Sequence, residues 1–384
     1  MKVLHCPEIV GGNAQQLAKA EREVGLDSTA VALRGSSFGY KSDKMLLSKP
    51  VGRLRLELAK WELFFRAFSF DVVHFNFGQA IMPAPRPIDR VEFNWLQRRL
   101  IQAYFRVFEL LDVKLLKACG KVTVMTYQGD DARQGDYCRE NFPITFANEV
   151  DQAYYSPESD RLKRVRIAKY AKYVDRIFSL NPDLLHVLPE HAQFLPYCHI
   201  DLREWSVVER TPAEQNVRPV VLHAPSHRGV KGTRFILDAV SRLQEEGIDF
   251  EFVMVEGMRQ DEARRLYERA DILVDQLLAG WYGGIAVELM ALGKPVIAYI
   301  READLKFVPE EMRAQLPVVQ AEPETIYEVL KRCLTTDRGL LPEMGMRSRR
   351  FVERWHDPHQ IAVRMLETYK NCVREKNNGS GQIG

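Results

Sequence analysis

The chain has 384 residues, of which 46% are hydrophobic and 28% charged, and its 54 Lys and Arg nearly balance its 52 Asp and Glu. This composition is typical of a folded globular protein and excludes a disordered chain. The length suits two domains of ordinary size, and the net charge of +2 excludes no class of partner.

The cysteines and the chain ends indicate a cytoplasmic protein. Six cysteines are scattered without a CxxC pair, so neither a zinc site nor a thioredoxin-like motif is predicted, and we expect reduced thiols. The amino terminus carries no long apolar segment with a cleavage site, and no apolar run reaches the length of a membrane span. We expect the glycine-rich tail, 377–384, to be mobile.

The first half alternates short apolar runs with helical patterns. The run 2–6 is predicted to be a strand that leads through Gly11 and Gly12 into a helix beginning at Asn13, with Asn13 and Gln16 as a capping pair. The loop lacks a complete GxGxxG, so no dinucleotide fingerprint is present. We interpret the two glycines as positions where a ligand could approach the backbone closely.

Two helical patterns in this half are rich in basic residues. The pattern 93–119 mixes aromatic and basic side chains, which suits either docking on a membrane surface or a core face with a solvated side. The segment 161–175 is strongly basic, and anionic lipid headgroups, a charged acceptor or plain solvation all fit it. No nucleic-acid-binding motif accompanies it, so no nucleic-acid partner is expected.

The strand 122–127 ends in a polar turn, Gln128–Cys138, where parallel sheets place their ligands. Asp130 and Asp131, next to Arg133, could act as metal ligands, as a base, or as a cluster that stabilises the turn. The adjacent spacing selects none of these.

After a polar stretch at 206–217, which we interpret as a linker, the alternation of predicted strands and helices begins again. Strands are predicted at 220–226, 250–257, 270–275 and 296–300, with helices between them. Two such halves predict an α/β protein with two doubly wound Rossmann-like domains facing across a cleft. We expect the domains at 1–205 and 218–355, with a helix at 356–376 that packs back on the first domain.

The richest stretch is GWYGGIAVELMALGKPV, a glycine loop that runs into a short helix. The amides of Gly283 and Gly284 at the helix start suit a phosphate, and Glu288 one turn later can accept hydrogen bonds from hydroxyls. Glycines needed only for close packing are the alternative. Arg228 and Lys231 follow the first strand of this half, so cations and amides together predict a pyrophosphate site.

At this point the chain resembles the GT-B glycosyltransferases, in particular the retaining family 4, or "glycosyl transferases group 1". KVLHCPEIVGGNAQQLA, VVHFNFG and VTVMTYQGDD are similar to the acceptor domain of that group, and HAPSHRGVKGT and DQLLAGWYGGIAVELMALGKPV to its donor domain. The resemblance implies that Arg228 and Lys231 hold the donor diphosphate and that Glu288, the second Glu of an E-x7-E motif, holds the ribose. We place Gly11, Gly12, Glu256, Gly283 and Gly284 with them as donor-binding candidates.

Two residues depart from the family pattern. The first Glu of the motif, which contacts the donor sugar in the family, is replaced by Gly280, so Trp281, Tyr282 or Asp275 substitutes or the sugar is held differently. Gln128 stands where many relatives carry a His. Because Gln cannot act as a base, Asp130 or Asp131 becomes the candidate, unless the donor phosphate itself takes the proton.

The sequence therefore predicts a metal-independent retaining glycosyltransferase of the cytoplasm, acting there or at the inner face of the membrane. Its co-substrate would be a nucleotide-diphosphate sugar of the UDP or GDP type, without a tightly bound cofactor, and its acceptor a glycan, a glycolipid or another hydroxyl compound. The alternatives are a sugar-nucleotide epimerase and a catalytically degenerate glycan-binding protein. The catalytic candidates are Gln128, Asp130, Asp131, Arg228 and Lys231.

Overall fold

The computed structural model describes residues 1–35, 39–40, 42–49, 51–84, 94–151, 153–207 and 218–380. The chain divides into two compact units: unit 1 comprises 1–135, 155–199 and 358–384, and unit 2 comprises 136–154 and 200–357. The segments 136–154 and 200–205, which the sequence placed in the first domain, therefore belong to unit 2. Residues 208–217 of the expected linker and 381–384 of the expected tail lie outside the described residues.

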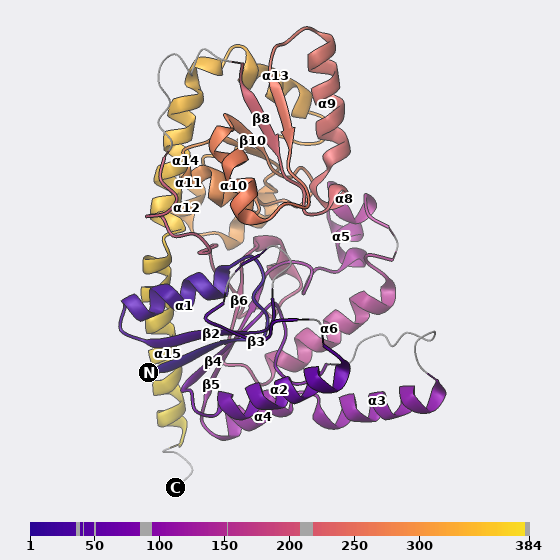
Figure 1. Ribbon diagram of the computed structural model, residues 1–384, viewed down its shortest axis with the longest axis vertical. Helices are drawn as coiled ribbons and strands as arrows, with labels where there is room; N and C mark the ends of the chain where they lie inside the picture. The colour runs from indigo at the N-terminus through magenta and orange to yellow at the C-terminus, as the bar shows by residue number, and fades with distance from the viewer. Residues whose placement is uncertain are drawn as a thin grey trace. The chain divides into compact units, whose positions relative to one another are not determined.

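Unit 1 is built on a parallel sheet of order β3-β2-β1-β4-β5-β6-β7. Its strands are β1 (Lys2–Cys6), β2 (Asp27–Arg34), β3 (Lys44–Leu47), β4 (Val72–Asn76), β5 (Val122–Tyr127), β6 (Arg176–Ser179) and β7 (Gln193–Phe194). Its longer helices are α1 (Asn13–Glu23), α2 (Arg53–Ala67), α3 (Trp95–Phe108), α4 (Leu111–Ala118), α6 (Pro157–Ala171) and α15 (Pro358–Ser380) (Figure 1).

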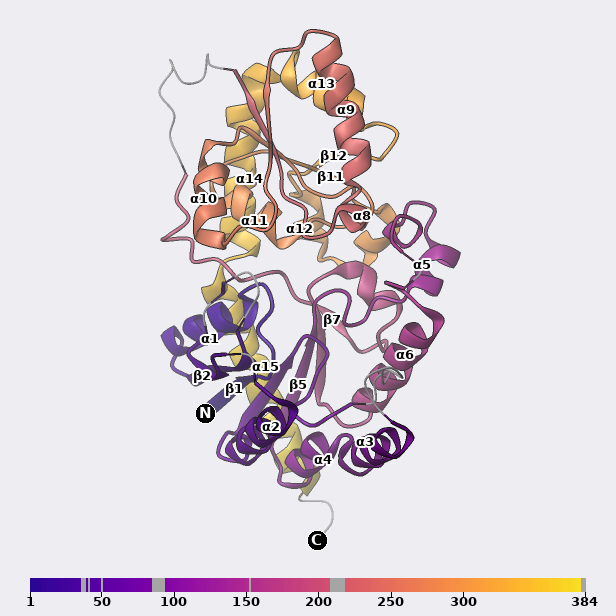
Figure 2. The same cartoon turned by 45° about the vertical axis from the view of Figure 1, so that its right-hand side comes forward.

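Successive strand residues point to opposite faces of this sheet, which gives unit 1 two apolar layers. Leu4 packs in one cluster with residues of α2, α4 and α6, whereas Val3 packs in the other with α1 and α15. Helix α15 lies beside α1 (Figures 1 and 2). Its buried Tyr369 hydroxyl contacts His74 Nδ1 at 2.8 Å and donates to Glu21 Oε1 at 2.9 Å, so polar contacts as well as apolar ones fix this helix.

Two local expectations for unit 1 are corrected. The helical pattern 93–119 forms two helices, because Leu110 is buried with φ of 62° and this left-handed residue ends the run. The residue before α1 is Gly12, also left-handed, and no side chain caps the helix. The Asn13 side chain instead accepts a hydrogen bond from the Cys198 amide at 2.9 Å.

Unit 2 contains a second parallel sheet, of order β12-β11-β10-β8-β9. Its strands are β8 (Val220–His223), β9 (Glu251–Met254), β10 (Ile272–Val274), β11 (Val296–Ala298) and β12 (Val319–Gln320). Helices α9 (Thr233–Glu245) and α13 (Ile326–Leu334) cover one face; α10 (Gln260–Arg269), α11 (Gly284–Ala291) and α14 (Leu341–Trp355) lie on the other (Figure 2). The expectation of two doubly wound Rossmann-like domains is confirmed.

The segment 136–154, which begins with α5 (Gly135–Asn141), packs against the start of unit 2. The short helix α8 (Arg228–Lys231) meets it at Gly229, where a Cβ would lie only 2.4 Å from the Glu149 carbonyl oxygen. Arg234, in the first turn of α9, donates to both Glu149 carboxylate oxygens at 2.5 and 2.7 Å. The segment is thus a fitted part of unit 2 although it lies far from the rest of that unit in the sequence.

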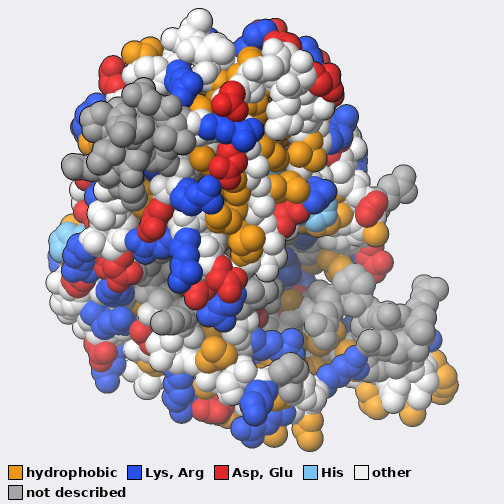
Figure 3. All heavy atoms as spheres, turned by 45° about the horizontal axis from the view of Figure 1, so that its top comes forward, with side chains coloured by type: hydrophobic (Ala, Val, Ile, Leu, Met, Phe, Trp, Pro, Cys, Tyr) orange, Lys and Arg blue, Asp and Glu red, His pale blue; other side chains and the backbone are white. Residues whose placement is uncertain are grey.

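Acidic and basic side chains are interspersed on the face drawn in Figure 3, in keeping with the small net charge. All six cysteines are free thiols. Among the described helices, none combines the length and the apolar character that a membrane crossing requires.

Candidate functional site

The predicted donor residues other than Gly11 and Gly12 belong to unit 2, where strand order in the sheet reverses. Strands β8 and β10 are neighbours, and the chain leaves β8 toward β9 on one side and reaches β11 on the other. The loops after β8 and β10 carry Lys231 and Asp275 respectively. Doubly wound sheets place ligands at this point, so the topology puts these loops in position for binding.

Lys231 is buried and lies at the centre of this group. Its Nζ is 2.6 Å from Asp275 Oδ1, and the other oxygen of Asp275 accepts a hydrogen bond from the Gly283 amide at 2.6 Å. A Cβ at position 283 would lie 2.9 Å from that Nζ, so glycine is what lets the ammonium reach the loop. Lys231 and Gly283 are therefore brought together, through a carboxylate whose bridging role the sequence did not indicate.

The start of α11 faces the same loops. Gly283 is its N-cap residue in an extended conformation and has no side chain to cap the helix, and its own amide donates to Asp275 Oδ2 at 2.6 Å. Gly283 and Gly284 are partly exposed, whereas the rest of the helix from Ala286 onward is buried. A partly exposed helix start with a positive dipole end is suited to an oxyanion, although Asp275 already takes the Gly283 amide.

Glu288 lies one turn further along α11, on the same helix face as Gly284. Its side chain is buried, and Oε1 accepts a hydrogen bond from Gln260 Nε2 at 3.1 Å. Burial, with the Glu288 carboxylate nearby, raises the pKa of Tyr267 on the same helix as Gln260. The carboxylate is thus positioned between α10 and α11.

Arg228 and Glu256 form an exposed pair at the edge of this group. Arg228 donates to both carboxylate oxygens of Glu256, at 2.8 and 2.6 Å, and its side chain is 59% exposed. These hydrogen bonds lower the pKa of Glu256. Because an exposed ion pair contributes only about 0–1 kcal/mol, the guanidinium can exchange Glu256 for a ligand anion at little cost.

Gly280 is the position that the sequence resemblance aligns with the first Glu of the E-x7-E motif, and the structure shows why a side chain does not fit there. Its φ is +78°, and a Cβ would lie 2.4 Å from Arg301 Nη1. Arg301 is itself buried, donates to Asp304 Oδ2 at 2.8 Å and to the Ile144 carbonyl at 3.0 Å, and stacks over the Phe142 ring at 3.7 Å. A fixed guanidinium therefore occupies the space beside Gly280.

The three residues considered as substitutes for that Glu all have internal partners. Trp281 and Tyr282 are fully buried and stack on each other at 4.5 Å between ring centroids. The Tyr282 hydroxyl contacts His356 Nε2 at 2.8 Å, and Asp275 holds Lys231. In this structure none of these three side chains presents an exposed face for a sugar.

In unit 1 the two acids after β5 have different surroundings. Asp131 is buried, and its carboxylate accepts hydrogen bonds from the amides of Gln128, at 3.0 and 3.1 Å, and Gly129, at 2.6 Å. Burial raises the pKa of Asp131 to about 6, against the opposing effect of those amides. This geometry matches the turn-stabilising alternative for Asp131.

Asp130 is the more accessible acid, with a side chain that is 39% exposed. It accepts a hydrogen bond from the Tyr155 hydroxyl and lies 3.9 Å from Arg133 Nη1. Beside it, the Gln128 carbonyl accepts from Asn181 Nδ2 at 2.6 Å, and the buried Gln128 Nε2 has no acceptor among the described residues. Asp130 and the Gln128 amide are therefore the groups of this turn that can serve a ligand.

Gly11 and Gly12 precede α1 with φ values of +64° and +75°. A Cβ at Gly12 would lie 2.8 Å from a Tyr40 ring carbon, so packing alone already requires glycine there.

Within the described residues, no group of three His, Cys, Asp or Glu side chains is arranged to hold a metal ion.

No family model matches the chain, and no curated protein matches it. Solved structures do. Sucrose-phosphate synthase from Thermosynechococcus elongatus superposes with a TM-score of 0.59 at 15% identity over 97% of this chain and 99% of that one. Anabaena HepE in complex with UDP-glucose gives 0.57 at 12% identity over 97% and 100%. A Listeria monocytogenes protein titled as a UDP-N-acetylglucosamine 2-epimerase gives 0.53 at 13% identity over 97% of each chain.

At these identities the likeness shows the fold. The chain has the GT-B fold, as the sequence resemblance predicted. Both glycosyltransferases and proteins titled as epimerases are among the neighbours.

Proposed function

We propose that this protein is a glycosyltransferase that moves a sugar from a nucleotide-diphosphate donor to a hydroxyl acceptor with retention of anomeric configuration and without a metal ion. The observation that carries the proposal is the meeting of Lys231, Asp275 and the start of α11 at the strand-order reversal of unit 2. Cations and helix amides aimed at a phosphate stabilise the charge that develops as the nucleotide leaves.

The contacts of Lys231, Asp275 and Arg228 give each of these residues a different role. Asp275 neutralises much of the charge of Lys231, and removing one partner of such a buried pair costs about 3–5 kcal/mol. Lys231 therefore stays with Asp275 and offers a remaining N–H to the diphosphate. The uncompensated positive charge comes from the α11 start and from Arg228 once it leaves Glu256.

Glu288 would hold the ribose hydroxyls, with Gln260 fixing its orientation. The donor would be of the UDP or GDP type, and UDP is the first probe because HepE was solved with UDP-glucose. For the acceptor's proton, Asp130 is the exposed acid in unit 1, and the donor phosphate is the alternative base.

The test is donor binding and turnover in Arg228→Ala, measured by titration calorimetry and by release of UDP or GDP. We expect the variant to lose at least tenfold in affinity, as for one charged hydrogen-bonding group. Arg259→Ala, which removes another exposed Arg that is paired with an acid, Asp261, is the matched control. Wild-type affinity in Arg228→Ala would refute the site assignment.

An epimerase is the second candidate, because the Listeria monocytogenes neighbour titled as a UDP-N-acetylglucosamine 2-epimerase shares the fold over 97% of each chain. Epimerisation needs no acceptor. Incubation with UDP-N-acetylglucosamine alone, followed by chromatography, would yield an epimerised sugar nucleotide or free UDP if this candidate is correct, and unchanged donor if it is not.

A glycan-binding protein without catalytic activity is the third candidate. It is motivated by Gly280 and Gln128, which stand at positions where the sequence resemblance leads one to expect functional residues. Thermal-shift measurements with UDP, GDP, ADP and CMP sugars separate it from both enzymes, since stabilisation by none of them favours the binding protein.

We further propose that unit 1 attaches peripherally to an anionic membrane surface, which would place the protein at the inner face of the cytoplasmic membrane. Trp95, Leu96 and Leu100 of α3 are 64%, 52% and 62% exposed, and basic Arg98 and Arg99 lie between them in the sequence. Apolar and basic side chains on one helix suit an interfacial position. Co-sedimentation with anionic vesicles that survives Leu96→Ser/Leu100→Ser would refute it.

A further inference from the structure

A cavity of about 270 Å³ lies in unit 1, and none of the residues assigned above is in its lining. It sits at the carboxyl ends of β1, β2 and β4, and among its lining residues are Glu8, Arg34 and Gln79 from the segments that end or follow those strands. Strand order in unit 1 reverses between β1 and β4, which is where a doubly wound sheet places a ligand. Each unit therefore has its own site at its own reversal point.

Three cations line this cavity: Arg34 at the end of β2, Lys60 of α2 and Arg166 of α6. Lys60 pairs with Glu57 at 2.7 Å. Arg34 and Arg166 form no ion pair with any residue that the structure describes. Glu8 is the one acid among the lining residues that the structure describes, and burial raises its pKa against the opposing charges of Arg34 and Lys60. The lining thus has an excess of positive charge.

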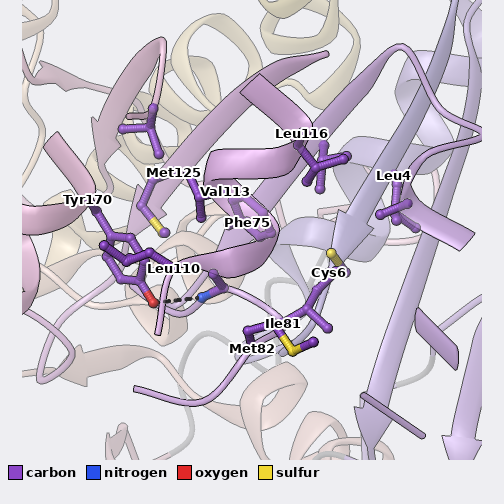
Figure 4. Close-up of a cluster of buried hydrophobic side chains, with 14 of the residues drawn as sticks. Leu4, Cys6, Phe75, Ile81, Met82, Leu110, Val113, Leu116, Met125 and Tyr170 are labelled. Atoms are coloured by element: carbon purple, nitrogen blue, oxygen red, sulfur yellow. Dashed lines mark hydrogen bonds between the residues drawn. The ribbon is translucent and has the colours of Figure 1, made fainter. Parts of the chain in front are cut away.

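Two hydrogen-bond donors in the wall of the cavity have no acceptor among the described residues. Arg166 Nη2 donates to the Asp131 carbonyl at 2.9 Å, while its buried Nε has no acceptor within the described ranges. The Tyr170 hydroxyl, 2% exposed as a residue, accepts from the Ala80 amide at 3.2 Å (Figure 4). Its own proton has no recorded acceptor among the described residues. Buried donors are normally satisfied, so these two indicate a missing acceptor.

The remaining wall is apolar and rigid. Ile81 and Met82 extend from the buried cluster that Figure 4 shows, with Tyr170 beside them. The volume is near the lower end for small-molecule sites, which begin at about 300 Å³. Such a space suits one compact group with an apolar face and negative charge. Arg166 also links this wall directly to the Gln128–Asp131 turn through the Asp131 carbonyl.

We propose that this cavity binds a phosphate or carboxylate group carried by the hydroxyl acceptor, with Arg34 and Arg166 as its ligands. The inference rests on the proposed glycosyltransferase function and assigns its acceptor a chemical class: an anionic hydroxyl compound. Guanidinium groups match both oxyanions through paired hydrogen bonds. The anion is carried either by a free sugar derivative or by a lipid headgroup.

The experiment measures binding to the full-length protein by titration calorimetry, with glucose 6-phosphate, glucuronate and uncharged glucose as probes. Co-sedimentation with phosphatidylglycerol vesicles forms the lipid arm. The variant is Arg34→Gln, and Arg55→Gln is the matched control because Arg55 is exposed on α2 and does not line the cavity. Arg34 is itself exposed, so its replacement should leave the fold intact, which circular dichroism checks.

We expect an anionic probe to bind more tightly than glucose, and Arg34→Gln to weaken it at least tenfold while Arg55→Gln does not. Arg34 dependence in the soluble arm identifies a free anionic acceptor, and dependence confined to the vesicle arm identifies a lipid headgroup. Equal binding by wild type and Arg34→Gln in both arms, or glucose binding as tightly as its phosphate, overturns the proposal.

UDP is titrated into the same samples. UDP binding without Arg34-dependent anion binding refutes this inference alone, whereas Arg34-dependent anion binding without UDP binding refutes the donor site alone.

Discussion

A Glu at position 280, which the sequence resemblance aligns with the first Glu of the E-x7-E motif, should damage this protein rather than improve it. At φ of +78° an L-residue costs about 1–2 kcal/mol. A Cβ there also lies 2.4 Å from Arg301 Nη1, about 1 Å inside ordinary contact, so the guanidinium must move away from Asp304. Disrupting a buried ion pair costs about 3–5 kcal/mol.

The sum, about 4–7 kcal/mol, is comparable with the whole stability of an ordinary domain, about 5–15 kcal/mol. Gly280→Ala and Gly280→Glu should therefore lower the melting temperature of unit 2 by roughly 10–25 °C. Urea unfolding followed by circular dichroism measures the free energy, and nucleotide release measures turnover.

Gly247→Ala is the matched control. Gly247 has the same φ of +78° in the same unit, but a Cβ there would meet nothing within 4 Å. It should lose only the backbone contribution of about 1–2 kcal/mol. Equal losses at positions 280 and 247, or a Gly280→Glu variant that is as stable as wild type and turns over faster, would refute the role assigned to Arg301.

Two further results are expected. Burial lowers the pKa of His223 from 6.5 to about 4, so the unfolded chain takes up a proton first as pH falls. About 3 kcal/mol of stability should be lost as the pH falls from 6.5 to about 4. The melting temperature of His223→Gln should therefore change less over that range than the melting temperature of the wild type. An equal dependence of melting temperature on pH in both proteins would contradict this. Asp131→Asn should lower the free energy of unfolding by about 1–3 kcal/mol, because it disrupts the hydrogen bonds from two amides. Asp130→Asn should change it by no more than about 0.5 kcal/mol. Urea unfolding compares the two variants, and equal losses would count against a turn-stabilising role for Asp131.

The doubly wound architecture could be predicted from the sequence because its signals are local. Buried parallel strands appear as short apolar runs such as 122–127 and 220–223, and helices between them carry their own periodicity. The GT-B fold followed from that alternation together with the motif resemblance, and the structural neighbours confirm it.

The contacts inside the candidate site could not be predicted, because they join residues distant in sequence. Asp275 and Lys231 are 44 positions apart. Nothing in the sequence of either loop indicates that the Asp275 carboxylate accepts hydrogen bonds from both the Lys231 ammonium and the Gly283 amide. The occupant of the space beside Gly280 is Arg301, which belongs to the next strand's loop. The cation-lined cavity of unit 1 likewise draws its three basic residues from three separate elements.

The placement of 136–154 in unit 2 bears on how this protein can be engineered. If only the part of the chain after residue 217 were exchanged, Glu149 would remain and would face a new α8, whereas in this protein position 229 tolerates no side chain and Arg234 pairs with that carboxylate. The transplantable module is therefore discontinuous: 136–154 together with 200–357. An exchange at one crossover point cannot deliver this module, so replacing it as a unit requires two separate segments to be exchanged together.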